Sequence, residues 1–426
     1  MIDYFKTLNI QIDASYNEVK NAYFNMTKKY PPEKFPKEYR VIRDAYETLI
    51  DKSKREEYIL ENFDYEGRNI LKEAVDAFKK EEFKEAILNF ETILKKYPNN
   101  SKVKRDLALS LMKVGNYKKS SKIFKELVIR EPNNIENYKA LIKIYEDNKE
   151  KDNLESVLKK SIKLKNVEVD FYIKLFKLYN EEKKDYKEAL IVLREGLNNK
   201  NIDSKKYKLY MKFLDITDRL NLKSDFSKGC KALSEFTIEE DYEEVKEEIF
   251  FLLDRCLREF HFKNGSRLTA TALILIDERR DSKDIEKIMK LRRSFLEFSR
   301  LYEDKDIDKN FKKVIFYNGV NSFLKNDIQF NRDVENVNGI FFENFNFENY
   351  EVVNSVGRLK KEYRNVYLET KDINDRILGK YSKSKREKVT FEKERKREEY
   401  NKEIFHKDKE SSMKSLFKNF IKNFKK

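Results

Sequence analysis

The feature that most constrains this chain of 426 residues is a repeat of 34 residues in its first half. The segments KYPNN (96–100) and REPNN (130–134) place Pro98 and Pro132 34 positions apart. A period of about 20–50 residues indicates stacked units, because one unit of this length cannot bury its apolar face alone. The spacing therefore predicts an elongated array of helical pairs rather than one closed core.

The residues around the two prolines also follow the spacing of paired helices. Small residues such as Ala86 and Gly115 let two helices approach closely, while aromatic residues such as Phe90 reach toward the next unit. This pattern resembles the tetratricopeptide repeat, and the resemblance implies an α-solenoid that binds proteins along its concave face. We expect the following residues to pack the repeats: Ala74, Ala86, Phe90, Pro98, Ala108, Gly115, Phe124, Pro132 and Ala189.

Weaker units extend the predicted repeats over residues 67–240. Residues 138–158 outline a third unit that lacks the small residue and the closing proline. Residues 185–197 resemble the second helix of a fourth unit, and residues 225–236 belong to a fifth. The repeat array is therefore expected to continue well beyond its two clearest units.

Helical periodicity persists from residue 241 to residue 379 without the repeat consensus. Two interpretations stay open for this region: divergent helical pairs that continue the solenoid, or a separate helical domain. Residues 328–350 follow neither the helical nor the strand period, so their secondary structure is left open. An apolar stripe over residues 352–377 predicts a packing helix that caps the array and ends at Gly379.

The first 62 residues contain two apolar stripes at helical spacing, one over residues 19–30 and one over residues 39–49. Pro31 and Pro32 lie between them. Proline supplies no amide hydrogen and restrains the residue before it, so this pair stops the first helix. The pattern predicts two antiparallel helices joined by a short proline turn.

Four segments of this region carry a resemblance to a known family. They are DYFKTLNI (3–10), DAS (13–15), EVKNAYFNMTKKY (18–30) and RDAYETLIDKSKREEY (43–58). They resemble the J domain, a helical module that binds DnaK-type chaperones through a basic second helix and a His-Pro-Asp turn, and stimulates their ATPase. The resemblance implies that residues 1–62 dock such a chaperone.

At the position of that turn the chain has Pro31-Pro32-Glu33, so only the middle proline matches the family. Asn21 and Asn25 also stand where further positive charge is expected in the family. The resemblance therefore implies docking with impaired stimulation of the chaperone ATPase. The residues expected to contact the chaperone are Lys20, Lys28, Lys29, Pro31, Pro32 and Glu33.

The chain ends in two segments that differ in charge. Residues 380–410 mix twelve Lys or Arg with eight Asp or Glu, and predict a spacer that is either a single solvated helix or disordered. Residues 411–426 hold five lysines and no acid, and Ser411 or Ser412 would cap the start of a basic amphipathic helix. The apolar face of this helix consists of Met413, Leu416, Phe417, Phe420, Ile421 and Phe424.

Three kinds of partner suit this C-terminal helix. An anionic membrane surface would take up the apolar face while the lysines meet the headgroups. At about 1.5 Å per residue the helix is too short to span a bilayer. Alternatively, the face docks on the protein's own repeats or on a partner helix. Nucleic acid is the least favoured partner, because the repeats interleave Glu with Lys instead of presenting a basic face.

The composition argues against several classes of function. The chain is 39% hydrophobic with only nine Gly and five Pro, which favours an all-α fold. Cys230 and Cys256 are its only cysteines, which suits a reducing cytoplasm, and no cleavable signal sequence is visible. The only histidines are His261 and His406, and together with the two cysteines they show neither a metal-ligand spacing nor the motif of a catalytic triad. We expect no cofactor, no metal and no enzymatic activity.

Together these patterns predict an all-α protein: a J-like hairpin domain, a tetratricopeptide-like α-solenoid and a charged tail, helical or disordered. The expected function is that of a protein-interaction adaptor of the chaperone or co-chaperone class, with protein partners or clients held by the repeats. The alternative is a membrane-surface scaffold that is anchored by residues 411–426 and recruits partners through its repeats. In either case we expect a cytoplasmic protein, and in the second one a place at the inner face of the membrane.

Overall fold

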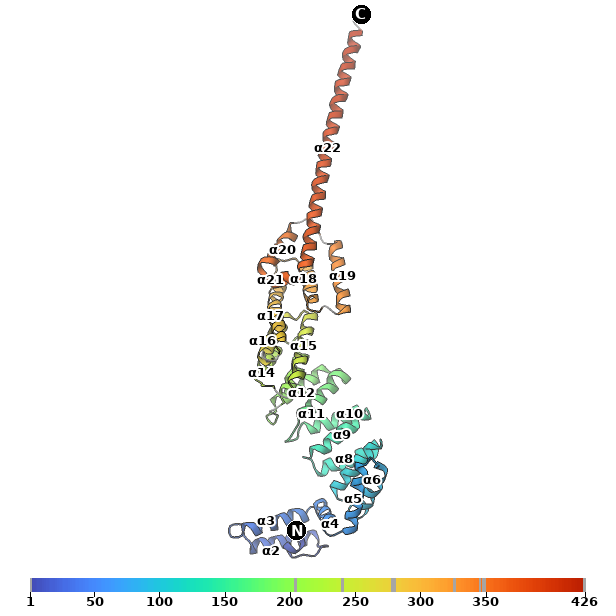
Figure 1. Cartoon of the computed structure of the whole chain (residues 1–426), viewed down its shortest axis with the longest axis vertical. Coiled ribbons are helices and arrows are strands. Elements are labelled where there is room, and N and C mark those ends of the chain that lie inside the picture. The colour runs from blue at the N-terminus through green and yellow to red at the C-terminus, as the bar shows by residue number, and fades with distance from the viewer. Residues whose placement is uncertain are drawn as a thin grey trace. The chain divides into compact units, whose positions relative to one another are not determined.

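The computed structural model describes residues 2–202, 205–238, 241–276, 281–324, 327–344, 346 and 350–423, with the backbone alone for residues 400–423. Every regular element in these ranges is a helix (Figure 1), which confirms the all-α prediction. The chain divides into two compact units, Met1–Leu209 and Tyr210–Lys426. The division lies inside the predicted span of repeats rather than at its end.

The first four helices of unit 1 follow local signals in the sequence. Ser15 and Glu18 form a capping box, in which the amide of Ser15 donates to Glu18 Oε2 at 2.7 Å and the amide of Glu18 donates to Ser15 Oγ at 3.3 Å. Pro36 occupies the first turn of its helix, where no amide hydrogen is needed. The helices are α1 (Tyr4–Leu8), α2 (Tyr16–Lys29), α3 (Pro36–Leu49) and α4 (Lys52–Asn62).

These helices enclose a small apolar core of their own. The apolar stripes of α2 and α3 face each other there. As predicted, the proline turn joins the two helices: α2 ends before it and α3 begins after it. Tyr23 and Tyr46 stack across the two helices with ring centroids 4.1 Å apart. The buried residues of this core are Phe5, Leu8, Ala14, Val19, Ile42, Ala45 and Leu49.

Paired helices occupy the rest of unit 1. Asparagine or aspartate side chains begin several of them; Asn100 Oδ1, for example, accepts from the amide of Val103 at 3.1 Å. The pairs are α5 (Tyr65–Lys79) with α6 (Phe83–Lys96), α7 (Ser101–Lys113) with α8 (Tyr117–Arg130), α9 (Ile135–Asp147) with α10 (Lys151–Ser161), and α11 (Val169–Lys177), continued by the π-helix η1 (Leu178–Lys183), with α12 (Tyr186–Asn198). The 34-residue period thus corresponds to one pair of helices.

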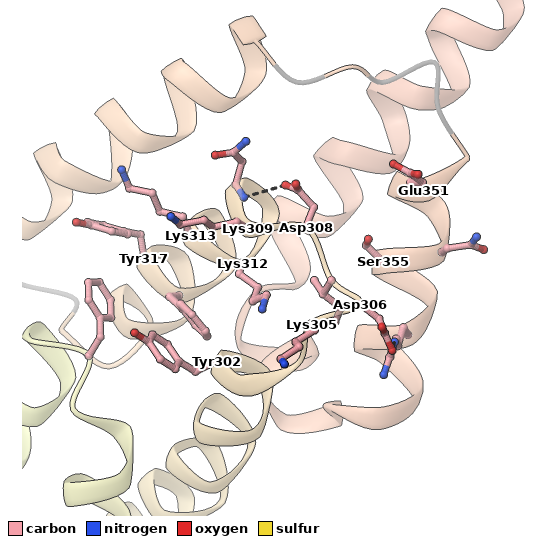
Figure 2. A pocket seen from close by; sticks show the side chains of 16 residues that line it. Tyr302, Lys305, Asp306, Asp308, Lys309, Lys312, Lys313, Tyr317, Glu351 and Ser355 are labelled. Carbon is pink, nitrogen blue, oxygen red and sulfur yellow. Dashed lines mark hydrogen bonds and ion pairs between the residues drawn. The ribbon is translucent and has the colours of Figure 1, made fainter. Parts of the chain in front are cut away.

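Consecutive helices continue to pack together in unit 2. They are α13 (Tyr207–Arg219), α14 (Lys223–Leu233), α15 (Tyr242–Arg258), α16 (Phe262–Leu275), α17 (Ser282–Glu303), α18 (Lys309–Asn321) and α19 (Ile328–Asn344). Helix α19 accounts for most of the stretch 328–350, whose secondary structure the sequence left open; the remainder lies partly outside the described residues. A hollow borders the loop before α18 (Figure 2).

The stripe over residues 352–377 is buried, but it forms three helices instead of one. They are α20 (Glu351–Glu362), α21 (Arg364–Glu369) and α22 (Lys371–Asn423). The backbone leaves the helical region at Tyr363, with φ −132° and ψ 55°, and again at Thr370, with φ −115° and ψ 20°. These two bends let short helices fold back on one another.

Two predicted boundaries in the tail are wrong. Gly379 does not end a helix, and neither Ser411 nor Ser412 begins one, because α22 runs through all three positions. A single glycine costs a helix only about 1 kcal/mol relative to alanine, and it ends the helix only if the backbone turns there. Residues 380–410 and 411–426 are therefore not separated from each other, or from residue 379, by a break in the described backbone.

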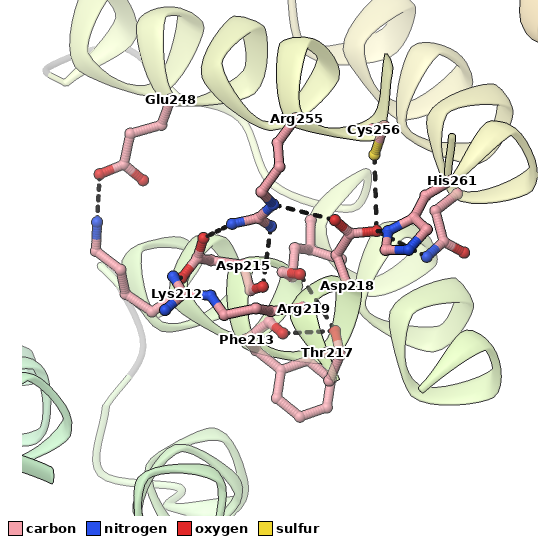
Figure 3. A network of polar contacts seen from close by, with 12 residues as sticks. Lys212, Phe213, Asp215, Thr217, Asp218, Arg219, Glu248, Arg255, Cys256 and His261 are labelled. Carbon is pink, nitrogen blue, oxygen red and sulfur yellow. Dashed lines mark hydrogen bonds and ion pairs between the residues drawn. The ribbon is translucent and has the colours of Figure 1, made fainter. Parts of the chain in front are cut away.

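A buried carboxylate joins α13, α15 and α16 in unit 2 (Figure 3). Asp218 is fully buried, and it accepts hydrogen bonds from Arg255 Nε at 3.1 Å and from Asn264 Nδ2 at 2.9 Å. His261 Nδ1 lies 3.0 Å from Asp218 Oδ1, and Cys256 Sγ lies 3.7 Å away from the same oxygen. His261 stands directly before α16, as its N-cap residue.

Within the part of the chain that the structure describes, we find no helix that combines the length and the apolar character needed to cross a lipid bilayer.

Candidate functional site

The outer face of α2 is the first part of the candidate site. Lys20, Lys28 and Lys29 are all exposed on it, and none has a carboxylate partner among the described residues. Phe24 lies one turn after Lys20 and one turn before Lys28, with 49% of its surface exposed. The face therefore combines positive charge with one exposed aromatic ring.

The turn after α2 is held by its own backbone. Pro31 O accepts hydrogen bonds from the amides of Lys34, at 3.1 Å, and Phe35, at 2.9 Å. The rings of Tyr30 and Phe35 meet edge to face, 5.5 Å apart, across the turn. Pro31 is half-buried by these contacts, whereas Pro32 and Glu33 are exposed. The turn thus presents a fixed, solvent-facing tip.

Tyrosines support this hairpin from its inner side. A hydrogen bond with Tyr39 and partial burial raise the pKa of Tyr23 to about 12, so its hydroxyl stays protonated at neutral pH. On the outer side of α3, Arg43 Nε donates to Glu47 Oε1 at 2.7 Å, one turn further along the helix. The arginine pair stabilises α3 itself, whereas the hydrogen bond between Tyr23 and Tyr39 joins α2 to α3 beside the turn.

Helix α4 connects this hairpin to the helical pairs. Only Phe63 and Asp64 separate α4 from α5, so no long linker intervenes. Ile59 packs against both the core of the first four helices and the core of the first repeat. Leu60, fully buried, belongs to the core of the repeat.

Polar contacts strengthen the same junction. Glu56 accepts from the amide of Asn99 at 2.6 Å and from its side-chain amide at 2.7 Å. Ser53 Oγ accepts from the amide of Ser101 at 2.9 Å. Residues that belong to the hairpin domain by sequence therefore cap the first repeat, and the turn is held in a fixed place relative to the repeats of unit 1.

Asp64 sits at the centre of the junction. It accepts from the amide of Gly67 at 3.0 Å, from Lys96 Nζ at 2.7 Å and from the hydroxyl of Tyr97 at 2.8 Å. The hydrogen bond from Lys96, supported by those from Gly67 and Tyr97, lowers the pKa of Asp64 to about 2. Burial and the hydrogen bond to Asp64 raise the pKa of Tyr97 to about 12.

Comparison with known proteins identifies both parts. The DnaJ domain family matches residues 3–58, and the tetratricopeptide repeat family matches residues 77–143. The chain contains a J domain followed by tetratricopeptide repeats. This confirms both resemblances that the sequence analysis found. The turn of this J domain keeps only the middle proline of the His-Pro-Asp sequence.

Individual relatives match short stretches of this chain. A chaperone protein DnaJ of Staphylococcus carnosus is 37% identical over 70 residues, which are 15% of this chain and 18% of that protein. One of Streptococcus mutans is 43% identical over 61 residues, 13% of this chain and 16% of that protein. The chain thus spans less than a fifth of the length of these relatives. A thermophilic TPR protein of Thermus thermophilus aligns at 18% identity over 40% of this chain and 90% of its own, with a TM-score of 0.24.

The structure also shows residues of the J-domain surface that the sequence analysis missed. Lys34 and Lys37 are exposed directly after the turn, without a carboxylate partner among the described residues, and they add to the charge of Lys28 and Lys29. Phe24 was missed as well. The signal was present in the sequence, because an apolar residue at this spacing interrupts an otherwise polar helical face.

The expected packing residues of the repeats fall into two groups. Most are fully buried between helices, whereas Pro98 and Pro132 are exposed in the loops that follow α6 and α8. Gly115 has φ +78° in the loop between α7 and α8, a conformation that favours glycine. The buried group consists of Ala74, Ala86, Phe90, Ala108, Phe124 and Ala189.

The C-terminal face cannot be placed in the same way. Met413, Leu416, Phe417, Phe420 and Ile421 lie where the structure describes only the helical backbone of α22, and Phe424 lies outside the described residues.

The candidate site belongs to two kinds of interaction module. The J domain and the repeats are interaction modules. Pro31 offers no side-chain donor or titratable group at the first position of the turn, and its carbonyl is already bonded within the turn. In the described parts of the chain, no cluster of His, Cys, Asp and Glu is arranged to hold a metal ion.

Proposed function

We propose that this protein is an interaction adaptor of the co-chaperone class, which docks a DnaK-type chaperone through α2 and the turn of its J domain. The observation that carries this proposal is the exposed face formed by Lys20, Lys28, Lys29 and the tip at Pro32, on a J domain with an intact core. The relatives of this domain are named chaperone protein DnaJ, which supports the same class of partner.

The same proposal includes a reduced ability of the turn to stimulate the chaperone ATPase. Docking requires a complementary surface, whereas stimulation of hydrolysis requires groups that act on the chaperone only in its reacting state. Two of the positions that differ from the family, Pro31 and Glu33, are in the turn, and the other two, Asn21 and Asn25 on α2, leave the three exposed lysines of that helix in place. We therefore expect binding to be retained and ATPase stimulation to be reduced.

The repeats supply the second half of the adaptor. Helical repeats present extended surfaces on which a peptide or a helix of another protein is bound. Because α4 caps the first repeat through Ile59 and Glu56, a protein bound there is held at a set distance from the chaperone-docking turn. The protein would thus bring a client and a chaperone together without a flexible spacer between the two surfaces.

The test is single-turnover ATP hydrolysis by a DnaK-type chaperone with the full chain added, together with a direct binding measurement. We expect the natural chain to bind but to stimulate hydrolysis weakly, and the variant Pro31→His/Glu33→Asp to bind equally and stimulate more strongly. The variant Lys28→Ala/Lys29→Ala should lose binding, and Lys79→Ala/Lys80→Ala, on the repeats, should not.

Two outcomes contradict the proposal. Full stimulation by the natural chain would show that the turn is still an effective trigger. Failure of the natural chain and of the Pro31→His/Glu33→Asp variant to bind any DnaK-type chaperone would show that the J-domain surface serves another partner.

A second function, scaffolding at a membrane surface from the cytoplasmic side, is favoured by the tail. Helix α22 continues to Asn423, and its side chains from Lys385 to Glu399 are all exposed, as expected for a solvated helical tether. The C-terminal residues Phe417 and Phe420 would then enter the membrane interface. Co-sedimentation of the full chain with anionic vesicles tests this: the variant Phe417→Ser/Phe420→Ser should remain in solution, whereas equal recovery of both proteins would contradict it.

A further inference from the structure

Unit 2 contains a hollow that none of the preceding functions uses. It has a volume of about 1210 Å³ and lies between the end of α17, the loop that follows it, α18 and α20 (Figure 2). Its lining combines lysines with aromatic rings. The residues that matter for the argument are Tyr302, Lys305, Lys309, Lys313, Tyr317 and Glu351.

Two of the cations that line the hollow are already engaged. Arg358 Nη2 lies 3.1 Å from Asp304 Oδ2, and its Nη1 lies 2.9 Å from Asp306 Oδ2. Lys312 Nζ donates to the backbone carbonyl of Asp304. These contacts tie the loop after α17 to α18 and α20, so they shape the hollow and leave little charge for a ligand.

Three lysines remain without such partners. Lys305, Lys309 and Lys313 are exposed and have no carboxylate within ion-pair distance among the described residues. Lys309 and Lys313 are one helical turn apart on α18, with Cβ atoms about 5–6 Å apart, so both face the same side. The nearby carboxylate of Asp308 caps α18, because its Oδ1 accepts from the amides of Asn310 and Phe311 at 2.8 Å.

An aromatic surface adjoins these lysines. Tyr302 is 65% exposed and stacks on the buried ring of Phe316, with centroids 6.1 Å apart. The ring centroids of Tyr317 and Phe260 lie 5.0 Å apart. A large ring that stays exposed beside unpaired cations suits a ligand that carries both negative charge and an apolar group.

The size and the charge pattern narrow the class of ligand. The volume exceeds the range of about 300–1,000 Å³ in which small-molecule sites fall. The wall opposite the lysines in Figure 2 is α20, with Glu351 and Ser355 in its lining, so a continuous phosphate backbone would meet lysines on one side alone. A short peptide places separate carboxylates on one wall and polar backbone groups against the other.

We propose that this hollow binds an acidic peptide segment of a partner protein, with its carboxylates on Lys305, Lys309 and Lys313 and an apolar side chain against Tyr302. The site is independent of the J-domain turn. It would give the protein a second attachment point that does not involve the chaperone.

The experiment is fluorescence anisotropy with the full chain and a labelled peptide, Glu-Glu-Phe-Glu-Asp-Phe, at low salt. We expect the charge-reversal variant Lys305→Glu/Lys309→Glu/Lys313→Glu to bind at least about tenfold more weakly, since each tenfold is only about 1.4 kcal/mol of binding free energy. The matched control Lys118→Glu/Lys119→Glu/Lys122→Glu changes the net charge equally on α8 and should bind as the natural chain does. Circular dichroism establishes that each variant is folded.

Further variants and ligands in the same assay distinguish a peptide site from a general anion site. Tyr302→Ser, at an exposed position, should weaken binding of this peptide severalfold and leave binding of its phenylalanine-to-serine analogue unchanged. A peptide with Gln and Asn in place of the acids should not bind. Equal loss in the two charge-reversal variants, no loss in either, or stronger binding of inorganic tripolyphosphate or a thymidine oligonucleotide than of the peptide would overturn the proposal.

Discussion

Two carboxylates, one in each unit, hold helices together in opposite surroundings. Asp64, directly after the last helix of the J domain, ties the start of α5 to the end of α6 from a half-buried position, with 10% of its own side chain and 63% of that of its partner Lys96 exposed. Asp218 joins α13, α15 and α16 from a position with no solvent exposure. Both have a lowered pKa, yet only the first can exchange a lost partner for water.

The two carboxylates should differ in how much stability is lost when one hydrogen-bond partner is removed. At Asp218 burial opposes ionisation, and hydrogen bonds from His261 and Asn264 with the nearby charge of Arg255 more than compensate, so the pKa lies below its usual value. Removal of one partner leaves a charge in a medium that stabilises it poorly. At Asp64 the carboxylate still reaches solvent and keeps two further donors, so the loss of the exposed Lys96 should cost little. The two sites should therefore differ most when a single partner is deleted.

The largest effect is expected for Arg255→Met. Loss of the guanidinium leaves Asp218 with a weakly compensated buried charge, and breaking a buried pair costs about 3–5 kcal/mol. Urea unfolding combined with hydrogen exchange in α13, α15 and α16 would measure it. The double variant Asp218→Asn/Arg255→Met should recover part of the loss, and Arg219→Met, which removes a solvent-facing guanidinium from Asp215, should cost little. If Arg255→Met costs no more than Arg219→Met, the contrast between the two sites is wrong.

A smaller effect is expected for Asp64→Ala in unit 1. The substitution removes the cap of α5, which accepts from Gly67, and cap removal typically costs about 1–2 kcal/mol. It also releases the hydroxyl of Tyr97. Hydrogen exchange should rise in the first turn of α5 and at the end of α6 while the helices of unit 2 stay protected. Unchanged exchange at both places would show that Ile59 and Glu56 hold the junction without Asp64.

The two sites should also respond to opposite directions of pH. The hydrogen bond to Asp218 raises the pKa of His261 despite its partial burial, so this contribution to stability is complete below about pH 6.5 and is lost as the pH rises through the raised value. The pKa of Asp64 is about 2, so its contribution is present above about pH 4 and is lost as the pH falls toward 2.

Between pH 6 and pH 9 we therefore expect the stability of unit 2 to fall while the junction in unit 1 stays unchanged. Hydrogen exchange followed across this range, with rates corrected for intrinsic pH dependence, would separate the two. The variant His261→Gln should remove the slope of unit 2 in this window. A slope that persists in His261→Gln would assign the effect to other groups.

The sequence predicted the repeating part of the fold better than either carboxylate network. The period set by Pro98 and Pro132, and the local signals of caps and small residues, act within one helical pair, so they can be recognised without knowledge of the tertiary structure. The partners of Asp218 lie 37 to 46 positions away, on α15 and α16, and no local pattern links them. The same limit explains Gly379, since a glycine shows where a helix is able to end but not whether neighbouring helices require it to.

The candidate site divides in the same way. The apolar stripes of α2 and α3 determine which side of each helix is buried, so the exposed position of Lys20, Lys28 and Lys29 followed from periodicity. The fixed placement of the turn relative to the repeats did not follow, because it depends on contacts such as Glu56 with Asn99, 43 positions apart. Local spacing thus predicts surfaces, and long-range contacts decide how they are held.

The smallest effect is expected for Lys96→Met, which removes only the ammonium group from Asp64. The Lys96 side chain is largely exposed, and such an ion pair gains little because water solvates both charges well. Asp64 would keep its hydrogen bonds from Gly67 and Tyr97, so the urea midpoint should stay within experimental error. The pKa of Asp64, followed by NMR, should nevertheless rise, because the hydrogen bond from Lys96 is its main cause of lowering. A large loss of stability with Lys96→Met would mean that the junction behaves like the buried site at Asp218, and that exposure does not govern the difference between the two carboxylates.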